Sequence, residues 1–131
     1  MLTITALYAS VLALIYCKLS KNVIKLRRQH KVSIGHGGHK DLEQSIRAQA
    51  NFMEYVPLGL ILLSCLEINN VHPLIVCILG GLLFIGRFLH AKSFSTPGTD
   101  KTKRVQGMKL TFWSIQLMAG MNIFAFLVGF I

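Results

Sequence analysis

The sequence predicts an all-α integral membrane protein whose apolar segments form one bundle of four transmembrane helices. Its 131 residues are 53% hydrophobic and only 15% charged, whereas about a quarter of the residues in a soluble domain carry charge. Four apolar segments alternate with three polar connections, and each approaches the roughly 20 residues that cross a bilayer core of about 30 Å. Together they use nearly the whole chain, so residues 1–131 are expected to form a single domain.

Hydropathy and turn residues set the limits of these spans. The first is expected from about Leu2 to Cys17, with its helix continuing into the basic segment that follows. A short polar turn closed by Pro73 separates the second span from the third, and Pro97 and Gly98 are expected to break the chain before the fourth. The last three spans are expected at about residues 41–66, 73–94 and 105–131.

The first connection is long, basic and rich in glycine. Gly35, Gly37 and Gly38 favour an irregular turn before the second span. Asp41 and Gln44 then have the spacing of a capping box, in which side chains at both positions satisfy backbone N–H groups at a helix start. The second helix is therefore expected to begin near Asp41.

Lysine and arginine are concentrated in two of the three connections. The middle connection and both termini hold none. By the positive-inside rule, the two basic connections are expected in the cytoplasm and both chain ends on the opposite side. Because the net charge of +9 lies in segments that flank the membrane, topology and anionic lipid headgroups account for most of it. Membrane lipids are therefore expected partners, and nucleic acid is not.

A polar stripe enters the second span in the sequence RAQANFMEY. Arg47, Asn51 and Glu54 are spaced by four and then three residues, which places them on one helical face. A charged group in hydrocarbon costs about 3 kcal/mol or more, so such groups face the bundle interior, pair with each other or line a wet cavity. Two interpretations remain open: an Arg47–Glu54 ion pair that locks neighbouring helices, or a polar pocket at the cytoplasmic end.

The third and fourth spans add a second polar edge at the same border. Arg87 and His90 are three residues apart in GRFLHAKSF, and Arg104 begins the fourth span. The cationic side chains expected at this border are Arg27, Arg28, Arg47, Arg87, His90 and Arg104. One Glu54 cannot neutralise them, so they suit an anionic ligand whose carboxylates bind arginine in bidentate fashion.

The remaining glycines and histidines have structural explanations. Glycines of the third span, among them Gly80 and Gly86, are typical of close helix approach. His36 and His39 lie in the glycine-rich connection and are expected to have no further ligands nearby, and His72 is isolated. No metal site is therefore expected.

The stretch IRAQANFMEYVPLGLILL resembles the signature at the start of the second span in MAPEG proteins, the membrane-associated proteins of eicosanoid and glutathione metabolism. The resemblance covers essentially the whole chain: its length, four spans, paired basic residues after the first span, the RAxxNxxEY pattern with Pro57, GRFLH in the third span, and a basic residue followed by GM in the fourth. RAxxNxxEYxP is fairly specific, and the other pieces are weak alone. The chain looks most like the short bacterial branch, which implies the bacterial cytoplasmic membrane.

The resemblance implies a homotrimer and a ligand. In the enzymes of this family, glutathione binds between the first two helices of one protomer and the last two of its neighbour. Glutathione is therefore the implied cosubstrate, with Glu54 taking its ammonium and Arg47 a carboxylate. The positions that match glutathione-binding residues are Arg27, Arg28, Arg47, Asn51, Glu54, Tyr55 and His90.

The implied catalytic residue is Arg104, which resembles the arginine that stabilises the glutathione thiolate; Lys103 competes for this role because the register of the preceding connection is open. A free thiol with a pKa of about 8.5 is mostly protonated at neutral pH, and a cation beside sulfur favours the nucleophilic thiolate. The thiolate would attack a lipophilic electrophile, a hydrophobic small molecule or lipid, that arrives from the bilayer. Phe94 stands where several family enzymes have tyrosine, and it cannot donate a hydrogen bond.

Three functions remain open. The first is a glutathione transferase, or alternatively a peroxidase. The second is a noncatalytic member that binds glutathione or lipid and scaffolds partners, which Phe94 favours. The third is a small four-span drug exporter, which predicts a lone carboxylate deep in the first span, where this chain has none.

Overall fold

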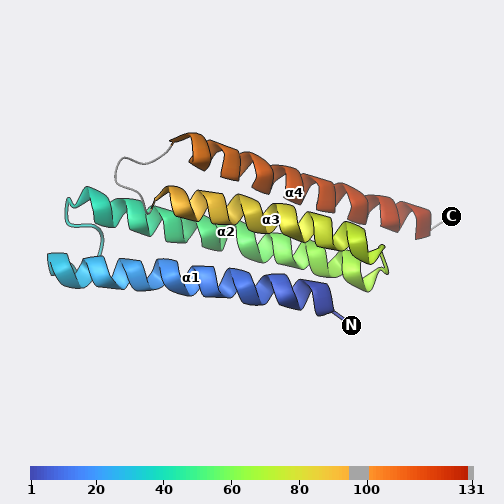
Figure 1. Cartoon of the computed structure of the whole chain (residues 1–131), viewed down its shortest axis with the longest axis horizontal. Helices are drawn as coiled ribbons and strands as arrows, with labels where there is room; N and C mark the ends of the chain where they lie inside the picture. Colours follow the sequence, from blue (N-terminus) through green and yellow to red (C-terminus); the bar gives the residue numbers. More distant parts are fainter. Residues whose placement is uncertain (95–100, 130–131) are drawn as a thin grey trace.

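The computed structural model describes residues 1–94 and 101–129 of the chain. The described residues form four helices that run lengthwise beside one another (Figure 1): α1 (Thr3–His30), α2 (Lys40–Ile68), α3 (Pro73–Ser93) and α4 (Lys101–Gly129). All four are long and apolar enough to cross a membrane. The predicted all-α fold with four spans is therefore confirmed.

Helices α1 and α4 are longer than their apolar segments, because each includes charged residues at the end nearest a basic connection. As predicted, α1 runs past Cys17 into the basic segment and ends at His30. The start of α4 lies at Lys101, four residues before the expected Val105. Lysine and arginine are good helix formers, so the helix continues where hydropathy has already fallen. The expected breakers Pro97 and Gly98 lie outside the described residues.

The connection between α1 and α2 begins with a left-handed helix cap. Lys31 has φ 55° and ψ 39°, and the N–H of Val32 donates to the carbonyl of Arg27 at 3.0 Å, the pattern of a Schellman motif. Gly37 has φ +56°, and a Cβ at this position would lie 2.7 Å from a methyl carbon of Val32. The expected irregular turn is confirmed, and Gly37 is the position where it most requires glycine.

The expected capping box at the start of α2 is wrong. The N-cap is His39, and α2 begins at Lys40, so Asp41 already lies in the first turn. Its carboxylate contacts His30 Nε2 at 2.8 Å through one oxygen and accepts from the backbone N–H of Leu42 at 2.8 Å through the other. Asp41 therefore joins the start of α2 to the end of α1, and a negative charge in the first turn also stabilises the helix dipole.

The two central helices, α2 and α3, each contact all three others, whereas no contact joins α1 to α4 among the described residues. The buried core between them includes Leu12 of α1, Leu63 of α2, Leu83 of α3 and Met118 of α4, all fully buried. Many large apolar side chains point outward instead. This arrangement suits a bundle surrounded by lipid or by other copies of the chain.

Helices α3 and α4 cross at two glycines. A Cβ added to Gly107 would lie 2.7 Å from the carbonyl oxygen of Gly86 and 2.8 Å from the backbone nitrogen of His90. Near the other end of α3, the ring of Tyr8 packs directly on Gly80, and its hydroxyl donates to the carbonyl of Cys77 at 2.8 Å. The expected close helix approach is therefore confirmed at Gly86, whereas Gly80 makes room for the Tyr8 ring.

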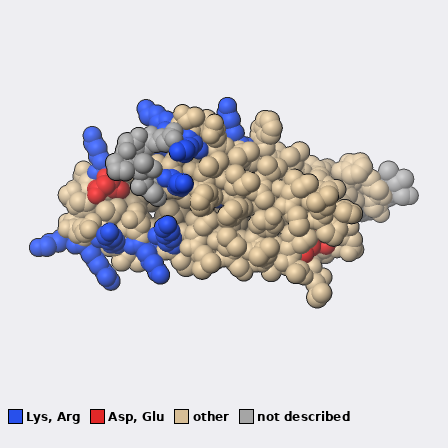
Figure 2. Space-filling model, viewed as in Figure 1, with Lys and Arg blue, Asp and Glu red and all other residues tan. Residues whose placement is uncertain are grey.

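The two ends of the bundle differ in charge. The α1–α2 connection and the start of α4 lie at one end, where the blue side chains in Figure 2 gather; we call this the basic end. The chain termini and the α2–α3 turn lie at the other end. There, the carboxylate of Glu67 accepts hydrogen bonds from the backbone N–H groups of Ile4 at 2.9 Å and Thr5 at 2.8 Å, and so caps α1 from α2. Which side of the membrane the basic end faces stays a prediction.

Candidate functional site

The polar stripe of α2 lies on a face that the rest of the chain leaves uncovered. Arg47 and Glu54 are exposed, and Asn51 between them is half-buried. Seven residues of helix separate the two charges by about 10.5 Å along the axis, and the salt bridges found in residues 1–94 and 101–129 include neither of them. The Arg47–Glu54 ion pair considered from the sequence is therefore not formed within the chain, and both charges face outward.

Asn51 is anchored from behind by Arg87. The Arg87 side chain is 0% exposed and donates from Nη1 to Asn51 Oδ1 at 2.8 Å. It also donates from Nε to Thr111 Oγ1 at 2.8 Å and from Nη2 to Met108 Sδ at 3.0 Å. The guanidinium thus joins α2, α3 and α4. Since Arg87 donates to the Asn51 oxygen, the NH₂ group is the part of this amide that can still donate to another group.

Tyr55 belongs to the same cluster. The Arg87 guanidinium carbon lies 5.3 Å from the centre of the Tyr55 ring, within the range of a cation–π contact. The Tyr55 ring also packs edge to face against the ring of Phe112 of α4, with the ring centroids 5.4 Å apart. Tyr55 and Asn51, two of the expected binding residues, are therefore held by one buried arginine.

His90 and Arg104 meet through Phe94. The rings of His90 and Phe94 lie 5.3 Å apart, and the Arg104 guanidinium carbon lies 5.0 Å from the centre of the Phe94 ring. His90 is 5% exposed, whereas Arg104 and Lys103 at the start of α4 are exposed. Phe94 therefore lies against both His90 and Arg104, although it has no hydroxyl for hydrogen bonding.

Arg27 and Arg28, the basic pair at the end of α1, have different surroundings. Arg27 Nη1 donates to the backbone carbonyls of Ser33 at 3.1 Å and Gly35 at 2.9 Å, so its guanidinium holds the α1–α2 connection. Arg28 is exposed. Both arginines were expected to approach a ligand carboxylate. Among the described residues, only Arg27 of this pair uses its guanidinium in hydrogen bonds to the chain, so Arg28 is the one available for that contact.

A cleft of about 910 Å³ opens between α1, α2 and α3 at the basic end. Its apolar lining includes Ile15, Leu19 and Phe88, and its lysines are Lys18, Lys21, Lys25 and Lys92. Apolar walls with a cationic rim suit an amphiphilic anion. The sequence interpretation assigned the basic residues of the connections to topology and anionic lipid headgroups. Their spacing of three and four residues on α1 was the signal that they share one face.

This chain is similar to bacterial inner membrane proteins. A model of the MAPEG family matches residues 5–124. The inner membrane protein YecN of Escherichia coli strain K12 is 34% identical over 120 residues, which cover 92% of this chain and 90% of that protein. YecN of E. coli O6:H1 strain CFT073 gives the same identity and coverage.

Proposed function

We propose, on the basis that this chain belongs to the MAPEG family, that it binds glutathione and acts as a glutathione transferase. One observation carries the proposal: Arg47 and Glu54 are exposed with opposite charges on one face of α2, on either side of an amide anchored by Arg87. Charges facing hydrocarbon are costly. A neighbouring protomer and a polar ligand with both charge signs would cover them.

Glutathione has an ammonium group and two carboxylates, which suits this face. Glu54 would bind the ammonium, and Arg47 would bind one carboxylate by charge-assisted hydrogen bonds. The Asn51 NH₂ group would donate to a carbonyl of the peptide. Arg28 would take the second carboxylate, since Arg27 already donates to loop carbonyls. Tyr55 and the buried His90 would complete the wall behind the ligand.

Arg104 would supply the chemical step. Its guanidinium, stacked on Phe94, would favour the glutathione thiolate over the thiol. The thiol would release its proton to water, and the thiolate sulfur would attack an electrophilic carbon of a lipophilic substrate, form a thioether bond and expel the leaving group with its electron pair. The cation remains unchanged through this reaction, so no further cofactor is required for conjugation.

The site would lie in the inner membrane of a bacterium, at the interface between copies of the chain. The name of the E. coli relatives supports this location, and the charge distribution supports a cytoplasmic basic end. A homotrimer would bring α4 of one protomer to the uncovered face of α2 in the next. The electrophile, a hydrophobic small molecule or lipid, would then enter sideways from the bilayer.

The test uses purified full-length protein in detergent. We expect it to be retained on glutathione resin and to conjugate chlorodinitrobenzene. Arg47→Ala and Glu54→Ala each remove a charge-assisted hydrogen bond of about 1.5–3 kcal/mol, so glutathione binding should weaken by roughly tenfold or more. Arg104→Ala should lower kcat by about tenfold for each pKa unit of lost thiolate stabilisation, with a smaller change in Kd.

The control is Lys109→Ala, because Lys109 is an exposed cation of α4 that lies about 140° around the helix from Arg104. This variant should keep both binding and rate. If Lys103→Ala loses rate and Arg104→Ala keeps it, Lys103 is the thiolate partner. Binding without conjugation leaves the noncatalytic scaffold, which the absent hydroxyl at Phe94 favours. Equal glutathione binding by Arg47→Ala, Glu54→Ala and the unmodified protein would refute the site.

A further inference from the structure

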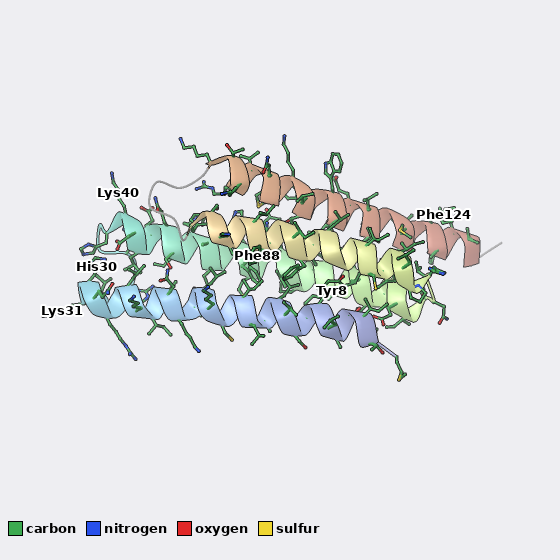
Figure 3. All side chains as sticks on the ribbon, viewed as in Figure 1. Tyr8, His30, Lys31, Lys40, Phe88 and Phe124 are labelled. Carbon is green, nitrogen blue, oxygen red and sulfur yellow. The ribbon has the colours of Figure 1, made fainter. Side chains whose placement is uncertain are left out.

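The α1–α2 connection at the basic end brings together three metal-ligating side chains from separate points of the chain. Donor atoms of His30, His39 and Asp41 all lie within 4.8 Å of one another. Figure 3 shows the His30 ring between the end of α1 and the start of α2. The expectation that the loop histidines have no further ligands nearby is therefore wrong for His39. Sequence spacing concealed the group, because His30 and Asp41 belong to different helices.

The loop is built so that these side chains meet. Its reversal uses three glycines with positive φ, Gly35, Gly37 and Gly38, and Arg27 holds two of its carbonyls. The His30 and His39 rings then stack with centroids 3.9 Å apart and planes 14° apart. The donor atoms of both rings also lie within 4.8 Å of a carboxylate oxygen of Asp41, and imidazole nitrogen is a common ligand of Zn²⁺.

The side chain of His39 does not cap the helix that it precedes. It is the N-cap of α2, where serine, threonine, aspartate or asparagine commonly accept a hydrogen bond from the helix. Its side chain makes no capping hydrogen bond, and within residues 1–94 and 101–129 its ring nitrogens have no hydrogen-bond partner. The ring instead lies against His30, with nitrogen lone pairs available beside the Asp41 carboxylate.

We propose that His30, His39 and Asp41 bind one Zn²⁺ ion, with water as the fourth ligand, and that the ion fastens the end of α1 to the start of α2. Two imidazoles and one carboxylate with an open position form a known zinc ligand set. Imidazole nitrogen disfavours Mg²⁺ and Ca²⁺, which prefer oxygen ligands. The site is separate from the α2 stripe and does not depend on glutathione binding.

Binding requires the two imidazole rings to turn out of their stack, because each nitrogen lone pair lies in its ring plane and the two planes are only 14° apart. His30 Nε2 and Asp41 Oδ2 lie 2.8 Å apart, and two ligands about 2.1 Å from a tetrahedral Zn²⁺ would lie about 3.4 Å apart. The Asp41 side chain is 54% exposed, so it can rotate by this amount without disturbing the core. Lys31 and Lys40 are exposed, so water and salt screen their repulsion of the ion.

The experiment uses the full-length protein in detergent, purified through a tag without histidine and stripped with EDTA. Co²⁺ serves as the spectroscopic probe, because tetrahedral Co²⁺ absorbs visible light strongly, and Zn²⁺ is then added in competition. We expect one Co²⁺ per chain, displaced by Zn²⁺ and not by Mg²⁺. His30→Ala, His39→Ala and Asp41→Asn should each weaken binding by at least about tenfold.

The matched control is His36→Gln. His36 lies in the same loop, where its Nδ1 accepts from the N–H of Gly38 at 3.2 Å, and it is outside the ligand group; its variant should bind within about twofold of the unmodified protein. Zn²⁺ should also raise the melting temperature of the unmodified protein and of His36→Gln, but not that of His39→Ala. No saturable Co²⁺ binding, or equal loss in His36→Gln and His39→Ala, would overturn the proposal. If His30→Ala fails to fold, Asp41→Asn and His39→Ala still decide it.

Discussion

Arg87 is fully buried in the bundle, and the salt bridges of the described residues give it no carboxylate partner. Its guanidinium is satisfied by an amide oxygen, a hydroxyl and a thioether, and it also lies over an aromatic ring. These acceptors come from two other helices. A buried donor without a partner costs more than the hydrogen bond itself contributes, so each acceptor around Arg87 matters for the stability of the bundle.

The variant Thr111→Val tests how much the hydrogen bonds of the buried Arg87 matter for stability. Valine has nearly the shape of threonine but leaves Arg87 Nε, now 2.8 Å from Thr111 Oγ1, without an acceptor. We expect unfolding in detergent to become easier by about 1–3 kcal/mol, measured by thermal or denaturant melting. Thr102→Val is the control, because Thr102 is exposed on the same helix. An equal effect of both variants would contradict the role assigned to Thr111.

At the scale of the element, the α3–α4 crossing depends on the absence of side chains. Gly107→Ala would push a methyl group against the backbone of Gly86 and His90, and backbone cannot move aside as a flexible side chain can. We expect the two helices to separate and the protein to lose about 1–3 kcal/mol of stability, seen as a lower melting temperature.

The control for this variant lies on the same helix. Gly120 is exposed, and a Cβ there would have no heavy atom within 4 Å. Gly120→Ala should therefore leave stability unchanged or raise it by up to about 1 kcal/mol, since alanine is the better helix former. If Gly107→Ala melts no lower than Gly120→Ala, the two helices do not cross as tightly as described.

Sequence reasoning succeeded for features that depend on local composition. Apolar length predicts the spans because hydrocarbon thickness sets it, and the three-and-four spacing placed Arg47, Asn51 and Glu54 on one face. It could not find the partners of Arg87, because Thr111 meets it only through the Gly86–Gly107 crossing. It located the start of α2 to within one residue of Lys40 but gave Asp41 a capping-box role, since sequence spacing did not reveal that the carboxylate contacts His30 across the loop.

At the scale of the whole molecule, α1 and α4 lie on opposite sides of the central pair without touching. The Arg47–Glu54 face remains uncovered by the chain itself. A site assembled from one protomer's α2 and the next protomer's α4 follows from the proposed trimer. Such a site can be tested without a structure of the assembly.

Mixing two inactive variants provides this test. If Arg47 and Arg104 at one site come from different protomers, co-expressing Arg47→Ala with Arg104→Ala yields some interfaces that hold both native arginines. We expect conjugation activity to return in the mixed assembly, while each variant alone stays low. Native mass spectrometry should detect three chains of 14.6 kDa each. Single chains at every protein concentration, or no regained activity, would argue for a site within one protomer.

Two polar contacts join α1 to α2. The carboxylate of Glu67 binds the start of α1 at one end, and the His30–Asp41 contact joins the two helices at the other. Both contacts lie between residues 4 and 67, so neither needs α3 or α4. During synthesis, the first two helices can therefore enter the membrane and pair as a hairpin while the second half of the chain is still being translated. The later helices would then dock on a preformed α1–α2 template.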